Sequence, residues 1–132
     1  MKYFDRYKME FYPLGSRKSK VKIVEASILP DDPAAPIGKM MMDRMDTIAR
    51  EIKEARKNRK SVILTFGAHT IKNGLGRVLA ALIEEGWVTH LATNGAGVIH
   101  DWEFAYQGLS SEDVRENVQE GKFGIWEETG LY

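Results

Sequence analysis

Apolar positions in the second half of the chain follow a strand–helix–strand pattern. Residues 61–66 form a short β-branched run, typical of a strand buried in a parallel sheet. Residues 71–85 repeat leucine, valine and isoleucine at helical spacing, and Gly86 follows as a stop signal. Residues 87–93 predict a second strand. Together these segments predict one βαβ unit, which requires parallel strands and a right-handed crossover.

The first half of the chain is less regular. Residues 21–26 alternate partly between apolar and polar and predict a short edge strand. Three prolines within residues 30–36 exclude a helix interior or a central strand, so this stretch is interpreted as a connector. Residues 37–57 carry apolar side chains at intervals of three and four, which predicts an amphipathic helix. Its methionines fit packing in a core or at a subunit interface.

Shorter elements follow the βαβ unit. Residues 101–107 predict a short helix. Residues 110–113, Ser-Ser-Glu-Asp, are typical of a helix cap and predict another helix that extends to about residue 119.

Composition narrows the function classes. The 19 basic residues balance 19 acidic ones, so charge gives no reason to expect nucleic acid or an anionic membrane as a partner. Cysteine is absent, which excludes disulfides, cysteine metal sites and thiol nucleophiles. The first residues lack the apolar core of a signal peptide, so a cytoplasmic location is expected.

Two segments follow the predicted strands, at the strand ends where open parallel sheets bind ligands. Residues 66–72 lead from strand to helix, so their amides could face an anion, although no Gly-x-Gly-x-x-Gly or P-loop pattern is present. Residues 93–103 include the small residues Gly95, Ala96 and Gly97, which let a ligand approach the backbone. Polar side chains lie on both sides of them in the sequence, at Thr93, Asn94, His100, Asp101 and Glu103. A small-molecule site is therefore expected at these two segments.

The same side chains allow a second interpretation. His69, His100, Asp101 and Glu103 could converge to hold a metal ion in a hydrolase. Their spacing matches no standard ligand motif, and Asp101 could equally cap the following helix. A third interpretation is a nucleotide-binding or assembly module without catalysis.

Residues 62–103, with Gly74-Leu75 and residues 91–101 as the strongest pieces, resemble the deoxyhypusine synthase family. Tyr12-Pro13-Leu14, residues 17–21, 66–75, 94–101, 110–114 and 121–124, and Glu128-Thr129-Gly130 resemble more closely an uncharacterised bacterial branch of deoxyhypusine-synthase-like proteins. The similarity to that branch covers nearly the whole chain.

This resemblance implies an α/β fold with a three-layer, Rossmann-like parallel sheet that binds NAD. The sheet would be incomplete here, because two or three parallel strands leave exposed edges. Residues 1–36 would form an N-terminal arm and connector, and residues 37–132 the dinucleotide-binding domain. Family members are much longer, and the lysine that forms their covalent imine has no counterpart here. The chain is therefore expected to be a piece of a longer protein or a shortened homologue.

Position by position, the resemblance implies a cofactor site and a catalytic group. Ala68 and His69 fall where the synthases have a Ser-Asn pair, Asn94-Gly95-Ala96 fall on a Thr-Ala-Gly turn, and His100 replaces a glutamate. The expected cofactor-binding residues are Gly67, Ala68, His69, Thr93, Asn94, Gly95, Ala96 and Gly97. The expected catalytic residues are His100, Asp101 and Glu103. An amine or polyamine substrate and a homo-oligomer are also implied.

Overall fold

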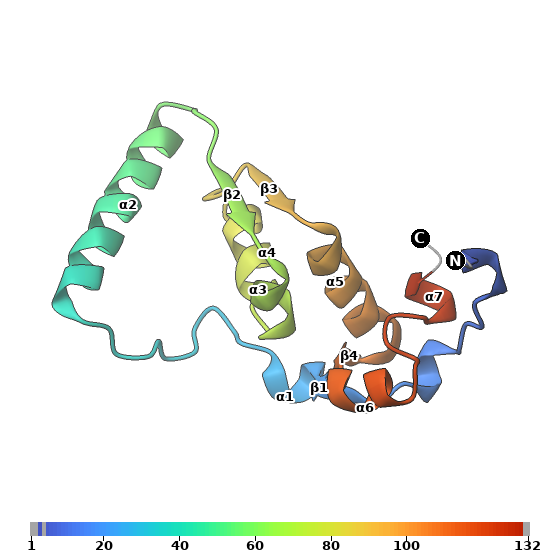
Figure 1. Ribbon diagram of the computed structural model, residues 1–132. Helices are drawn as coiled ribbons and strands as arrows, with labels where there is room; N and C mark the ends of the chain where they lie inside the picture. The colour runs from blue at the N-terminus through green and yellow to red at the C-terminus, as the bar shows by residue number, and fades with distance from the viewer. Residues whose placement is uncertain (1–2, 4, 131–132) are drawn as a thin grey trace.

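A pair of parallel strands lies at the centre of the computed structural model, which describes residues 3 and 5–130 (Figure 1). The strands are β2 (Ile63–Phe66) and β3 (His90–Thr93). Ile63 lies opposite His90 and Phe66 opposite Thr93, so the carboxyl ends of both strands are level. The predicted parallel pair is confirmed, and the fold is mixed α/β.

The helix predicted over residues 71–85 is instead two helices. They are α3 (Ala68–Lys72) and α4 (Gly76–Glu84). Gly74 separates them with a φ of 89°, and a side chain at Gly74 would overlap the backbone carbonyl of Ala26. A residue with a positive φ and no room for a Cβ has to be glycine and cannot continue a helix. The periodicity was continuous through this break, which is why the prediction was wrong there.

Helix α5 (Gly95–Gln107) begins at Gly95 rather than at residue 101. The side chain of Asn94 caps it by accepting a hydrogen bond from the amide of Gly97 at 3.0 Å. Gly108, in the left-handed conformation with a φ of 70°, ends it. The Gly-rich stretch was predicted to be an extended turn and is the first turn of a helix.

A second sheet joins the N-terminal segment to the second half of the chain. Strand β1 (Ser19–Lys22) pairs antiparallel with β4 (Leu109–Glu112). The strand predicted over residues 21–26 is therefore wrong in its last four residues, which form the short helix α1 (Ile23–Ala26). The predicted cap at residues 110–113 reduces to Asp113, which accepts a hydrogen bond from the amide of Glu116 at the start of α6 (Val114–Gln119). The proposed division of the chain at residue 36 stays a prediction.

The core lies between the helices and one face of the strands. Ile71, Leu79 and Phe104, from α3, α4 and α5, form the buried cluster. The partly buried side chains packed against it are Val21, Ile23, Leu64 and Phe66. Burial of these apolar surfaces holds the helices and both sheets together.

The long helix α2 (Lys39–Lys57) stands to one side of this core, as Figure 1 shows. Its existence and its C-terminal end are as predicted. The remaining elements are short: η1 (Arg6–Lys8), η2 (Leu14–Ser16) and α7 (Glu127–Gly130). Within the described residues, no helix combines the length and apolar character needed to cross a membrane.

Candidate functional site

A buried chain of hydrogen bonds links the N-terminal segment, α5 and β4. The guanidinium of Arg17 donates to both carboxylate oxygens of Glu103, at 2.6 and 2.8 Å. The hydroxyl of Ser110 donates to Oε2 of the same carboxylate at 2.6 Å. Nδ1 of His100 lies 2.6 Å from that hydroxyl oxygen. The four side chains therefore form one connected network.

The local folding of each segment brings these side chains together. His100 and Glu103 are three residues apart, so they share one face of α5. The turn at Gly108 sends the chain back along β4, which puts Ser110 beside that face. Pairing of β1 with β4 then positions Arg17, which precedes β1.

The network fixes the tautomer of the His100 ring. A carboxylate can only accept hydrogen bonds, so the single proton of the Ser110 hydroxyl is directed to Glu103. The short contact between His100 and Ser110 then requires Nδ1 to donate its proton to the hydroxyl oxygen. In the neutral ring, Nε2 is left with a lone pair. Among the described residues, Nε2 has no hydrogen-bond partner.

The surroundings of His100 favour the neutral ring. Burial lowers the pKa of His100 from its usual 6.5, because a charged imidazolium would lose hydration. The carboxylate of Glu103 acts in the opposite direction, whereas the positive charges of Lys72 and Arg17 and the electrostatic effect of the His69 ring lower the pKa of His100 further. His100 is therefore suited to accept a proton or a hydrogen bond through Nε2 at neutral pH.

The turns after β2 and β3 lie side by side, as predicted. Phe66 pairs with Thr93, and the Thr93 hydroxyl donates to the Phe66 carbonyl at 2.9 Å. The helices that follow, α3 and α5, pack against each other. His69 and His100 lie on these two neighbouring helices, and their convergence on one ligand stays a prediction.

Four backbone amides at these two helix starts are unused. They belong to Ala68 and His69 in α3 and to Gly95 and Ala96 in α5, and none has a partner within the described part of the chain. The space beside Gly67 and Gly95 is open, because a Cβ added at either would meet nothing within 4 Å. We call these four amides the amide rim. Unpaired amides at a helix start attract anions.

Gly97 does not serve the ligand site that was expected of it. It is buried, and the side chain of Thr93 fills the space where its own Cβ would lie. Its small size allows α5 to approach β3 closely rather than a ligand to approach the backbone. The prediction of Gly97 as a cofactor-binding residue is therefore corrected to a packing role.

The two expected catalytic carboxylates, Asp101 and Glu103, are placed differently from the prediction. Glu103 is only 2% exposed and both its oxygens are engaged, so it cannot touch a substrate and acts instead on His100 through Ser110. Asp101 is exposed and lines two hollows of about 240 and 340 Å³, neither of which includes His100. It does not cap α5, because Asn94 does.

The metal interpretation fails on geometry. The described residues contain no group of three or more histidine, aspartate or glutamate side chains arranged to hold a metal ion. Glu103, one of the four expected ligands, is bound to Arg17 instead.

Sequence reasoning missed two members of the network. The residues alone placed Arg17 in the N-terminal arm and Ser110 in a helix cap. Neither residue carries a local signal, because each gains its role from a partner distant in sequence or in another element. Trp102 of α5 is 40% exposed and stacks on Tyr106 with ring centroids 4.7 Å apart.

Comparison with known proteins identifies no relative. No protein-family model, no curated protein and no solved structure matches this chain.

Proposed function

We propose that the chain is the dinucleotide-binding part of an enzyme of the deoxyhypusine-synthase type, with His100 as its proton acceptor. Its substrate would be an amine or polyamine, and it would catalyse a transferase or oxidoreductase reaction. The observation that carries the proposal is the fixed His100 tautomer in α5, the helix that directly follows the second of two parallel strands. A Rossmann-like sheet completed by further strands, and a cytoplasmic location, belong to the same proposal.

The amide rim fits the pyrophosphate of NAD. Gly95 and Ala96 offer unpaired amides at the positive end of a 13-residue helix, and the open space at Gly95 admits a close approach. The exposed His69 side chain lies on the neighbouring helix and would hydrogen-bond the same group. When bound, NAD would supply a hydride acceptor for the amine carbon.

His100 would act on the substrate through Nε2. An amine that loses a hydride also has to lose a proton, and a neutral imidazole takes up that proton most effectively near its own pKa. Ser110 and Glu103 would stabilise the imidazolium that forms, because the Nδ1 proton already points along the network toward the carboxylate. Glu103 is a positioning residue in this scheme.

Cofactor binding is tested by titrating the full chain with NAD and NADP to millimolar concentration while following its melting temperature and heat of binding. We expect an upward shift in melting temperature that grows with concentration. His69→Ala should weaken binding. His90→Ala is the matched control, because His90 is also exposed but lies at the opposite end of β3. Absence of both shift and heat would refute the cofactor assignment.

The role of His100 is tested separately by ¹⁵N NMR of the histidine rings at neutral pH. We expect the Nδ1-protonated tautomer to predominate at His100. Ser110→Ala should remove that preference while the protein stays folded. A His100 ring protonated at Nε2 in the wild-type chain would contradict the proposed base, whatever the result with NAD.

A further inference from the structure

Helix α2 carries an apolar seam that the described part of the chain leaves largely exposed. Its members recur at intervals of four, three, four and three residues, which is the spacing of a coiled-coil seam. They are Met41, Met45, Ile48, Ile52 and Ala55. The first three are 50%, 51% and 54% exposed, and the last two are half-buried.

A helix of this kind needs a partner. Most helical stability in proteins comes from packing of the apolar face rather than from the helix alone, and this holds for the 19 residues of α2. The guanidinium of Arg56 lies over the ring of Trp87, 4.2 Å from its centroid, and supports the C-terminal end of α2. The rest of the seam receives no such support from the described residues.

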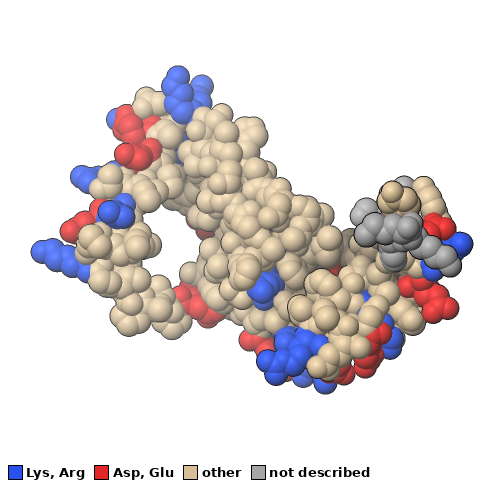
Figure 2. All heavy atoms as spheres, viewed as in Figure 1, with Lys and Arg blue, Asp and Glu red and all other residues tan. Residues whose placement is uncertain are grey.

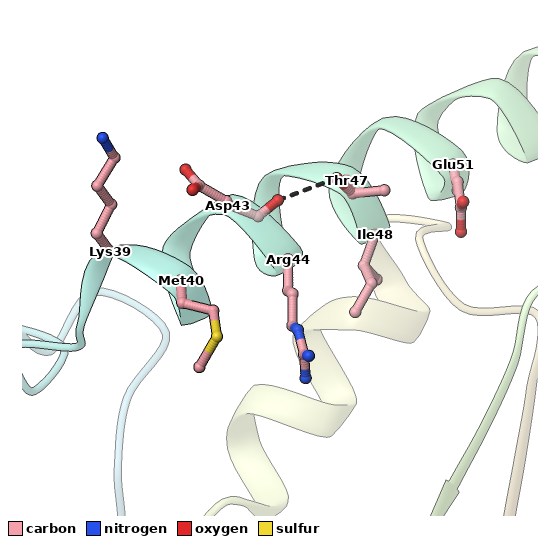
Figure 3. Close-up of a pocket in the computed structure, with 7 residues that line it drawn as sticks. All are labelled: Lys39, Met40, Asp43, Arg44, Thr47, Ile48 and Glu51. Atoms are coloured by element: carbon pink, nitrogen blue, oxygen red, sulfur yellow. Dashed lines mark hydrogen bonds between the residues drawn. The ribbon is translucent and has the colours of Figure 1, made fainter.

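The open hollow along α2 has a single wall. All seven residues that line it belong to α2 itself (Figure 3). Met40, Arg44 and Ile48 point to the same side of the helix, while Glu51 continues that row one turn further on (Figure 3). The hollow lies beside the seam and shares only Ile48 with it, so this neighbouring side of α2 is open as well.

We propose that a second copy of this chain covers the seam, with the two α2 helices antiparallel. In this arrangement Met45 packs against Ile48 of the second copy, and Met41 packs against Ile52 of the second copy. Each contact occurs twice by symmetry, as in any two-fold interface. The proposal concerns assembly and does not depend on the proposed function.

Charge complementarity selects the second copy and the direction. Beside the seam, the antiparallel alignment sets Arg44 opposite Glu51 of the second copy, and Glu51 opposite Arg44, which gives two ion pairs. A parallel alignment sets Arg44 opposite the uncharged Ala49. The same parallel alignment sets Glu51 opposite Arg56 of the second copy, whose guanidinium already lies over the ring of Trp87.

Sedimentation of the full chain over roughly micromolar to submillimolar concentrations tests the assembly. A 19-residue helix is only about 28 Å long, so we expect a reversible dimer in the micromolar range. Arg44→Glu should weaken the dimer about tenfold or more, because it places a negative charge opposite Glu51 of the second copy in both pairs. Adding Glu51→Arg should restore it. Arg50→Glu, the same charge change on the opposite side of α2, should leave it unchanged.

Cysteine cross-linking tests the direction, because the natural chain has no cysteine. A mixture of Met45→Cys and Ile48→Cys chains should form a disulfide between the two variants much faster than either variant does alone. Three results would each overturn the proposal. They are a monomer at every concentration, a dimer that forms through another surface of the protein, and faster cross-linking of each variant with itself than with the other.

Discussion

Arg17 and Glu103 form a buried, two-pronged ion pair across 86 residues of sequence. Their side chains are 4% and 2% exposed. The pair attaches the N-terminal segment to α5 and also holds the carboxylate that orients Ser110 and His100. Stability and the geometry of the candidate base therefore depend on the same contact.

Arg17→Met should destabilise the protein by about 3–5 kcal/mol, because it leaves the buried Glu103 carboxylate without its counter-charge. Urea unfolding measures this loss. Replacing both residues, as Arg17→Met with Glu103→Leu, should recover much of it, since no unpaired charge then remains buried.

Lys18→Met is the matched control for that experiment. Lys18 is the neighbouring cation and pairs with Glu116 at the surface. Because both groups are well hydrated, its loss should change stability little. Equal effects at positions 17 and 18 would contradict the role assigned to the buried pair.

Gly97→Ala should destabilise the protein by about 1–3 kcal/mol, because the new methyl group would collide with the side chain of Thr93. Gly95→Ala, two residues earlier in the same helix, should be tolerated, since the space beside Gly95 is empty. Thermal unfolding compares the two. Adding Thr93→Ala to Gly97→Ala should restore part of the loss, and a failure to do so would show that the two side chains do not compete for space.

The parts of the fold that depend on local pattern were predictable. The parallel strand pair and α2 follow directly from apolar periodicity and appear at nearly the expected places. Figure 2 shows why charge said little about the site: charged side chains gather over α2 and around β1 and α6, while the middle of this face is mostly uncharged.

The parts that depend on distant partners were not predictable. The break at Gly74 is imposed by the Ala26 backbone, and the pairing of β1 with β4 joins segments about 90 residues apart. A glycine-rich stretch after a strand is equally consistent with a ligand turn and with tight helix packing, and at Gly97 packing is the outcome.

Stability should fall at mildly acidic pH partly because of His100. Burial holds the pKa of His100 in the folded protein below its usual 6.5, so below that pH the unfolded chain binds more protons. The contribution of His100 to stability is complete above 6.5 and is lost as the pH falls from 6.5 through the lower pKa of the folded protein. His100→Gln should therefore flatten the decline in unfolding free energy between about pH 7 and pH 5. His90→Gln, at an exposed position of β3, should retain it.

Glu112 predicts a pH effect of the opposite sign. Burial raises its pKa in the folded protein above the usual 4.5, against the hydrogen bonds from the Gly124 amide and the Trp126 indole and the positive charge of Arg17. The folded state then binds more protons than the unfolded state, so the carboxylate lowers stability as the pH rises above 4.5. Glu112→Gln keeps an acceptor for Trp126 and removes the buried charge, so it should melt at a higher temperature than the wild type at pH 7. The difference should close as the pH falls below about 4.5, where the wild-type side chain is protonated in both states. A lower melting temperature for Glu112→Gln at pH 7 would mean that the attraction of Arg17 and the two donated hydrogen bonds outweighs the cost of burying the carboxylate.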